Sequence, residues 1–331
     1  MSGCQSSHYY TQAILGQVEL FRNSKPIEKV LQQNAVDDET KFQLKKILKI
    51  RNFATRELGL KNNKSYLYYS DIKRKYVVWN VFVTPALSLD AEQWCFPFAG
   101  CVTYRGYFKR NEAKIFLEKK KTEGMDVFLS GVSAYSTLGW FSDPVLNTFV
   151  NYSDIDLVRL VFHELAHQIV YVKDDTTFNE SFAVCIENEG VKRWLSANGS
   201  QVDRAVWEEH LLSKKNFFEI LEQKKDELTF LYKSDMTESI KLREKAIMFN
   251  QLKAEYNTFR QTWPRENRYD WLFSQTLNNA VLVAIANYSE YVPFFTNLLD
   301  KKKDFPSFFD EVITLAEQPF NKRKIIMELS N

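Results

Sequence analysis

The sequence predicts an α+β fold, in which a part with a small sheet and a helix pair is followed by a mostly helical C-terminal part. All ten glycines fall at or before Gly199, and strand-like segments occur only ahead of that point. Helices tolerate few glycines, whereas turns and strand bends need them. We therefore expect a mixed part over residues 1–199 and a helical part over residues 200–331, which could also form one continuous unit.

The first part alternates between helical and strand patterns. Residues 9–60 have the patterns of helices. Three segments are rich in β-branched and aromatic residues and are punctuated by Pro or Gly, as strands are: 76–85, 101–108 and 125–136. Residues 112–124 predict a helix between the last two of these strands.

A predicted helix pair closes the first part. Residues 152–172 carry apolar side chains at helical spacing, with Ser153 as N-cap and acids in the first turn, where the helix dipole favours them. A second helix begins after the polar loop 173–177 and runs to Gly199.

The second part is predicted to be nearly all helical. Apolar residues at helical spacing extend over 217–263, and Pro264 ends this pattern. A further helix is predicted over 269–292, ending near Pro293.

Composition excludes several classes of protein. The chain has 331 residues, of which 45% are hydrophobic and 26% charged, as is typical of a folded globular protein. Its 44 basic and 42 acidic residues give a net charge of +2, so nothing indicates nucleic acid as a partner. No apolar run is long enough to span a bilayer, and the N-terminus has no secretory apolar region.

The cysteines raise questions about modification. Cys4 follows Ser-Gly, as at the end of a bacterial lipoprotein signal, and is either the lipidated residue or part of a chance tripeptide. A Pro and a Gly between Cys95 and Cys101 permit a small-loop disulfide in an oxidising compartment. Cys185 lies among apolar helical positions and is predicted to be a buried free thiol.

A metal-binding pattern ends the first helix of the pair. The chain has four histidines, and two of them, His163 and His167, are four residues apart, with Glu164 directly after the first. On a helix this spacing places both imidazoles on one face, where they can bind one Zn²⁺ ion. Glu164 would then lie beside the ion as a general base for its water. The alternative is a pair of core histidines.

A third ligand is needed to complete such a site. Twelve residues separate Glu180 from His167, enough to turn the chain and place Glu180 in the first turn of the second helix. Two histidines and a glutamate form a known catalytic zinc shell. However, Glu180 also ends the segment Thr177–Glu180, which matches a helix capping box, and a carboxylate used as a cap would not bind metal.

Polar neighbours are candidates to support the ligands or to bind substrate. Glu187 lies two turns after Glu180 and could orient a ligand imidazole or be a surface carboxylate. Asn179 could bind substrate backbone or support the turn. Asp174 and Asp175 could also orient a ligand, although loop aspartates before a helix are usually caps.

These motifs resemble a known family. HELAH (163–167) followed by FNESFA (178–183) resembles the gluzincin metallopeptidases, in which an Asn-Glu pair on a second helix supplies the third zinc ligand. Longer strings resemble a family of Gram-negative bacteria termed "putative zinc aminopeptidases", at residues 3–17, 53–60, 76–82, 94–108, 134–149, 163–183 and 278–280. Two features depart from gluzincin aminopeptidases: a shorter gap between the second histidine and the glutamate, and no Gly-x-Met-Glu-Asn signature for the substrate's amine.

The resemblance implies a fold and an activity. The fold would be zincin-like, with a small sheet and an active-site helix pair. One Zn²⁺ ion would be held by His163, His167 and Glu180, and the protein would be a zinc peptidase and an aminopeptidase with Glu164 as general base. Its partner would be a peptide substrate. The alternative is a non-catalytic envelope protein, in which zinc is structural and residues 200–331 bind a partner.

The resemblance also suggests where substrate binds. An edge strand upstream of the first helix would pair with the peptide, and residues 133–149 are the natural equivalent. Asp143 could bind the substrate's amine or simply serve the turn before Pro144. Arg105 could bind a carboxylate or pair with an acid. An oxyanion donor is expected beside the zinc, and the candidates are Tyr104, Tyr135 and Tyr288.

The resemblance finally implies a location. Members of the family look like exported lipoproteins, which favours a lipid at Cys4 and a periplasmic protein anchored to a bacterial membrane. Contact with the membrane is expected only through this lipid.

Overall fold

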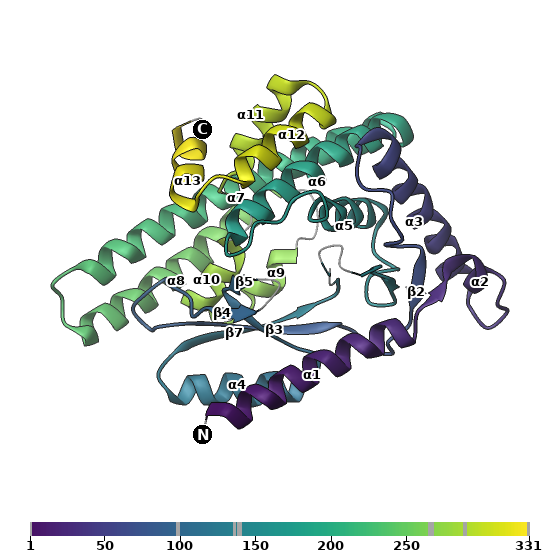
Figure 1. Cartoon of the computed structure of the whole chain (residues 1–331). Helices are drawn as coiled ribbons and strands as arrows, with labels where there is room; N and C mark the ends of the chain where they lie inside the picture. Colours follow the sequence, from purple (N-terminus) through teal and green to yellow (C-terminus); the bar gives the residue numbers. More distant parts are fainter. Residues whose placement is uncertain are drawn as a thin grey trace.

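The computed structural model describes residues 2–96, 100–134, 137, 141–263, 268–286 and 290–329. It has the predicted α+β fold with a helical C-terminal part (Figure 1). The elements of the first half are α1 (Ser2–Arg22), β1 (Lys25–Pro26), α2 (Ile27–Leu31), α3 (Asp38–Glu57), β2 (Tyr68–Ser70), β3 (Val78–Thr84), β4 (Trp94–Phe96), β5 (Gly100–Val102), β6 (Tyr104–Tyr107), α4 (Arg110–Thr122), β7 (Asp126–Val132) and β8 (Val145–Leu146). The elements that follow are α5 (Asp154–Ala166), α6 (Thr176–Asn198), α7 (Gln201–Lys233), α8 (Glu238–Arg260), α9 (Arg268–Phe273), α10 (Asn279–Ala286), α11 (Val292–Lys302), α12 (Phe305–Ala316) and α13 (Phe320–Leu329).

The main sheet is antiparallel and has the strand order β6-β3-β7. Because side chains alternate along a strand, β3 contributes to two cores. Val81 and Val83 pack in the core that includes Leu117 of α4, whereas Phe82 packs in the core that includes Leu252 of α8. Two smaller sheets have the order β1-β2-β8 and β4-β5, and a disulfide joins the last two strands between the predicted cysteines Cys95 and Cys101.

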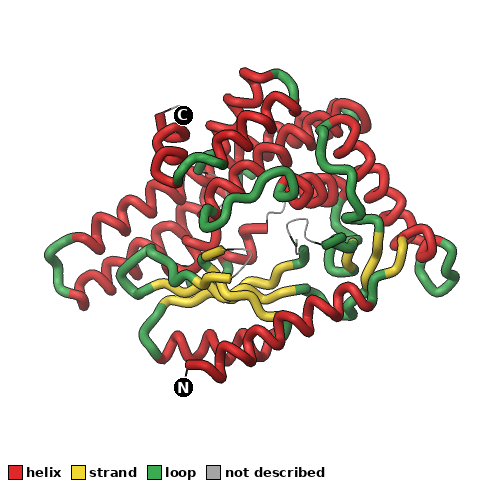
Figure 2. The backbone as a smooth tube through the Cα atoms, viewed as in Figure 1, coloured by secondary structure: helices red, strands yellow, loops and turns green. Residues whose placement is uncertain are grey.

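Different helices cover the two sides of the main sheet. In Figure 1, α1 and α4 lie below the sheet, and the pair α5 and α6 lies above it. Figure 2 shows that most of the remaining helices gather on the same side as this pair. No helix among the described residues is long and apolar enough to cross a membrane.

α5 and α6 pack closely because their facing surfaces are apolar. Val161 and Phe162 of α5 and Phe182 and Ile186 of α6 are fully buried. Gly190 lets the two helices approach, since a Cβ atom there would lie 2.5 Å from the ring of Phe162. Burial of each large apolar side chain contributes roughly 1.5–3 kcal/mol, so this packing holds the pair in place.

α5 is shorter than its apolar pattern predicts. It ends at Ala166 with His167 as C-cap, before the predicted end at residue 172. After Ala166 the amides of Gln168 and Ile169 donate to carbonyls three residues back. Further along, Nδ2 of Asn179 donates to the carbonyl of Val172 and its Oδ1 accepts from the amide of Val172, both at 2.7 Å. These bonds replace the helical partners of Val172 and hold the chain in a loop.

The predicted helix over 269–292 is also wrong, because the structure has a break between α9 and α10. Oδ1 of Asn278 accepts a hydrogen bond from the amide of Val281 at 3.0 Å, as an N-cap does. Nδ2 of Asn279 donates to the carbonyls of Pro85, Ala86 and Ser88. The apolar pattern over 217–263 is likewise divided between α7 and α8.

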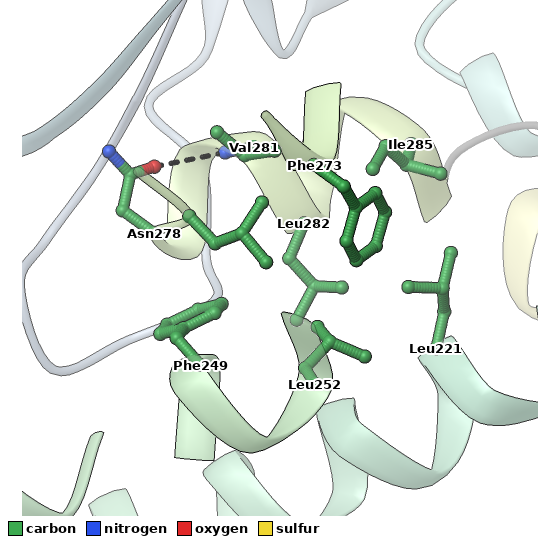
Figure 3. A pocket seen from close by; sticks show the side chains of 9 residues that line it. Leu221, Phe249, Leu252, Phe273, Asn278, Val281, Leu282 and Ile285 are labelled. Atoms are coloured by element: carbon green, nitrogen blue, oxygen red, sulfur yellow. Dashed lines mark hydrogen bonds between the residues drawn. The ribbon is translucent and has the colours of Figure 1, made fainter. Parts of the chain in front are cut away.

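A small apolar cavity lies among the C-terminal helices (Figure 3). Its lining residues are Leu221, Phe249, Leu252, Phe273, Leu277, Asn278, Val281, Leu282 and Ile285. Both polar atoms of the Asn278 side chain are already bonded: Oδ1 accepts from the amide of Val281, and Nδ2 donates to the carbonyl of Val127. A catalytic pocket needs several convergent polar groups, so we interpret this cavity as imperfect packing.

Candidate metal centre

The three predicted ligands meet where α5 ends and α6 begins. The Nε2 atom of His163 lies 3.2 Å from Oε2 of Glu180, and Nε2 of His167 lies 3.7 Å from Oε1 of the same carboxylate. One ligand atom from each residue lies within 4.8 Å of the other two. Ligand atoms about 2 Å from a tetrahedral Zn²⁺ ion lie roughly 3.3 Å from one another, so these side chains fit such an ion.

Glu180 is available to a metal because another residue caps α6. Asp175 is the N-cap, and its Oδ1 accepts a hydrogen bond from the amide of Phe178 at 3.1 Å. Its Oδ2 accepts from Nη2 of Arg323 at 2.6 Å, and both side chains are buried. The capping box Thr177–Glu180 is therefore not formed, and the capping role considered for Glu180 is wrong.

Side chains on both sides hold the loop between the two ligand helices. Nε2 of Gln168 donates to Oγ of Ser65 at 3.2 Å, and Oδ1 of Asp174 accepts from the amide of Cys101 at 2.5 Å. Asn179, considered for substrate binding, is only 1% exposed and uses its amide on the loop. It therefore supports the turn, which was its alternative role.

A buried ion pair supports His163 from behind. Its Nδ1 lies 3.2 Å from Oε2 of Glu187, and Oε1 of Glu187 accepts a hydrogen bond from Nε of Arg159 at 2.6 Å. Arg159 and Glu187 are 8% and 5% exposed. An imidazole whose Nδ1–H donates to a carboxylate presents Nε2 to a metal in a fixed orientation.

The charges of this cluster favour a cation between the ligands. Burial disfavours a charged His163, but Glu180 and Glu187 outweigh burial and raise the pKa of its imidazole to about 10. Burial lowers the pKa of His167 to about 4, which keeps it neutral. Burial would raise the pKa of Glu180, yet the hydrogen bond from His163 lowers it. At neutral pH a proton on His163 therefore meets the Glu180 carboxylate, and a bound Zn²⁺ ion would have to displace this proton.

Glu164 differs from the three candidate ligands in its contacts and in its pKa. Its carboxylate has no hydrogen-bond or ion-pair partner among the described residues. Burial raises its pKa to about 7, with His163 acting in the opposite direction and the charges of Glu180 and Asp143 adding to the rise. A carboxylate with a pKa near 7 can both accept and return a proton at neutral pH.

Two tyrosines near the centre were not among the predicted residues. The ring of Tyr171 lies 6.5 Å from that of His167, and burial and then the charge of Glu180 raise its pKa to about 12. Burial and then the charges of Glu164 and Asp143 raise the pKa of Tyr66 well above its usual value. The i+4 spacing of Tyr171 from His167 was a usable signal, whereas Tyr66 lies in a distant loop that no motif marks.

Of the other predicted residues, Arg105 lies away from the centre, Tyr104 packs within the main sheet, and two tyrosines lie outside the described part of the chain. Arg105 stacks on Tyr9 and Phe116 on the α1 and α4 side of the sheet, so it cannot bind substrate at this centre. The ring of Tyr104 packs 5.7 Å from that of Phe82. Tyr135 and Tyr288 lie outside the described residues.

Asp143 and residues 133–149 match the predicted substrate-binding edge strand only in part. Asp143 is 1% exposed, and its Oδ1 accepts a hydrogen bond from Oγ1 of Thr137 at 2.7 Å, which fits its turn role. Its charge nevertheless acts on Glu164, so it lies near the centre. Within 133–149, the described strand β8 pairs with β2 in a small sheet instead of extending the main sheet, and its two residues are buried.

Comparison with known proteins gives one match. A family model described as "Putative aminopeptidase" matches residues 8–327. No curated protein and no solved structure matches the chain.

Proposed function

Since the chain belongs to the family described as "Putative aminopeptidase", we propose that it is a zinc-dependent aminopeptidase. Family membership supports peptidase activity in general. The zinc dependence and the mechanism are supported by the meeting of His163, His167 and Glu180 next to Glu164, whose buried carboxylate has a pKa raised to about 7.

The donor set fits a catalytic ion better than a structural one. Two imidazoles and one carboxylate leave a tetrahedral ion with one open position, whereas structural zinc sites have four protein ligands. When bound, Zn²⁺ would lower the pKa of water to roughly 7 and polarise the carbonyl of the scissile bond.

Glu164 performs the proton transfers in this proposal. It takes a proton from the attacking water and delivers it to the leaving amine of the cleaved peptide bond. The raised pKa of Glu164 suits both steps, because the carboxylate exists at neutral pH and its acid form can still donate. Among the described residues, Tyr66 and Tyr171, whose pKa values respond to the charges of Glu164 and Glu180, are the candidate donors for the oxyanion that forms on the substrate.

The decisive experiment compares the wild type with Glu164→Gln. Both proteins should hold about one zinc, measured by atomic emission, because Glu164 is not a ligand. Cleavage of peptides with a free amino end should fall by ~10²–10⁴-fold in Glu164→Gln. A matched control is Glu189→Gln, which changes a carboxylate of α6 that pairs with Arg193 at 2.8 Å and should leave cleavage unchanged.

Three results would contradict parts of the proposal. Equal cleavage by wild type and Glu164→Gln would show that Glu164 is not the base. Equal cleavage of peptides with free and acetylated amino ends would rule out an aminopeptidase. Zinc-loaded wild-type protein that cleaves no peptide would favour the alternative, a zinc-stabilised envelope binding protein.

The proposed location is the periplasm, with a lipid on Cys4. The Cys95–Cys101 disulfide is compatible with an oxidising compartment. Mass spectrometry of the protein purified from membranes tests the lipid, and an unmodified Cys4 in that fraction would refute the anchor.

A further inference from the structure

The outer face of α1 carries a stripe of exposed apolar side chains. Tyr10, Ile14, Leu15 and Val18 are 43%, 62%, 61% and 54% exposed. Successive members are four, one and three residues apart, which places them on one side of the helix, opposite the buried positions 9, 12, 16 and 20. Single exposed apolar residues are ordinary, but four within about three turns form an apolar surface of the kind that marks an interaction site.

The neighbouring helix, α4, is strongly basic. Residues 109–123 contain six basic residues and three acidic ones, a net charge of +3. The whole chain has 44 basic and 42 acidic residues, so the other residues together have 38 basic and 39 acidic ones, a net charge of −1. Residues 109–123 therefore carry a local excess of positive charge, as residues 38–57 of α3 also do, and one of their lysines, Lys120, is paired with Glu92.

α1 and α4 present their outer surfaces on the same side of the molecule. Both helices lie below the main sheet (Figure 1), and Arg105 lies 4.2 Å from the ring of Tyr9 in α1 and 4.8 Å from that of Phe116 in α4. Ala113 and Leu117 bury the inner side of α4. The opposite side exposes Ile115 by 72%, and Lys114 beside it is exposed as well.

We propose that this surface, defined by Tyr10, Ile14, Leu15, Val18 and Ile115, binds an anionic lipid bilayer. Apolar side chains of an amphipathic helix enter the boundary between headgroups and acyl chains. Lysines beside them contact anionic headgroups while their alkyl stems cover apolar surface. The contact needs no acyl chain on Cys4 and would add a second point of attachment if one is present.

Charge argues for a bilayer over a second copy of the chain. A two-fold dimer through this surface would bring the two α4 helices, each with a net charge of +3, close to each other. An anionic membrane complements the same charge. With α1 and α4 against lipid, the helices α5 and α6 that carry the centre lie on the far side of the sheet from the membrane (Figure 1).

Vesicle sedimentation tests the proposal with the full chain carrying Cys4→Ser, so that no acyl chain contributes. This protein should pellet with vesicles of phosphatidylcholine and phosphatidylglycerol, and weakly with phosphatidylcholine alone. The triple change Ile14→Gln, Leu15→Gln and Val18→Gln should lower partitioning at least about tenfold. Lys114→Gln with Lys119→Gln should lower it roughly thirtyfold, and salt should lower it further in the parent.

The control removes equally exposed apolar side chains elsewhere. Val202→Gln with Phe230→Gln, at positions 69% and 81% exposed on α7, should leave partitioning unchanged. Circular dichroism checks that each variant is folded, and peptide cleavage in solution should be unaffected by all of them. Failure of the parent to pellet, an equal loss in the α7 control, or a concentration-dependent dimer that the α1 changes dissolve would overturn the proposal.

Discussion

Nε of Arg159 lies 2.6 Å from Oε1 of Glu187, and this buried pair stands directly behind the metal-binding face of His163. Each ligand helix thus supplies a ligand and a support one or two turns away: Arg159 and His163 on α5, Glu180 and Glu187 on α6. A buried ion pair adds little net stability, but removing one partner leaves the other charge unpaired. We therefore interpret the pair as a device that positions His163.

Arg159→Met should weaken metal binding and also destabilise the folded chain. Without Arg159 the Glu187 carboxylate loses its fixed orientation, and loss of such outer support typically lowers metal affinity by about 10–100-fold. Competition with a chromogenic chelator measures this affinity. The free energy of unfolding should also fall by about 3–5 kcal/mol, because Glu187 remains buried without its partner.

The control for Arg159 is an ion pair on the same helix pair that faces solvent. Arg193 lies 2.8 Å from Glu189, and their side chains are 37% and 23% exposed. Arg193→Met should leave zinc affinity unchanged, since exposed pairs contribute about 0–1 kcal/mol. Wild-type zinc affinity in Arg159→Met would show that Glu187 orients His163 without help.

Thr177 and Glu180 should respond in opposite ways to substitution. Glu180→Gln removes a ligand and should abolish tight zinc binding, whereas Thr177→Ala should leave both zinc and the stability of α6 nearly unchanged, because Asp175 is the cap. Zinc content after dialysis and thermal unfolding measure the two effects. A large loss of stability in Thr177→Ala would indicate that the capping box forms after all.

Much of the fold, and the grouping of His163, His167 and Glu180 as candidate ligands, could be predicted from local patterns. The histidine spacing and the helix signals around Ser153 are encoded within a few residues, so they are visible in the sequence. The capping choice at α6 is not, because Asp175 is held by Arg323, 148 residues further along the chain. N-cap propensity favours Thr177 as well as Asp175, and the contact with Arg323 decides that Asp175 is the cap.

Other residues whose role the sequence did not predict also depend on contacts between distant parts of the chain. In the sequence, Arg159 looks like an ordinary charged residue of a helix. Only the packing of α6 against α5 places Glu187 next to it. Arg105 was expected to bind an acid, yet its guanidinium lies between aromatic rings of α1 and α4, which lie far apart in the chain. The apolar periodicity also predicts a longer α5 than the structure has. The side chain of Asn179, on α6, holds Val172 in a loop instead.

The Cys95–Cys101 disulfide should stabilise the chain without being required for metal binding. It closes a short loop, which corresponds to roughly 2 kcal/mol in the chain-entropy account. Its hairpin meets the loop between the ligand helices at Gly100, which lies against Lys173 and Asp174, and through the amide of Cys101, which donates to Asp174. Urea unfolding of the double variant Cys95→Ser and Cys101→Ser should show this loss with zinc content kept. Reductant should destabilise the wild type and not the variant, and an equal effect on both would refute the assignment.

The pKa of His163 predicts how pH affects the zinc-free protein. Its pKa is about 10 in the folded chain and ~6.5 in an unfolded one, so the folded state holds an additional proton between these values. The free energy of unfolding should therefore fall as pH rises from ~6.5 to ~10. The lowered pKa values of Glu180 and Glu187 contribute stability that is lost as pH falls below ~4.5.

Zinc should reverse the upper part of this dependence, because the ion displaces the proton on His163 and binds more tightly as protons become scarce. Binding at pH 7 should release about one proton, measured by titration calorimetry in buffers of different ionisation enthalpy. In His163→Gln, the stability of the zinc-free protein should fall much less between pH 7 and 9, a window that lies between the contributions expected from the raised pKa values of Glu164 and Cys185. Two results would contradict this prediction: a wild-type stability that does not change with pH in this range, or zinc binding without proton release. Either would show that His163 is neutral at pH 7 and carries no positive charge between Glu180 and Glu187.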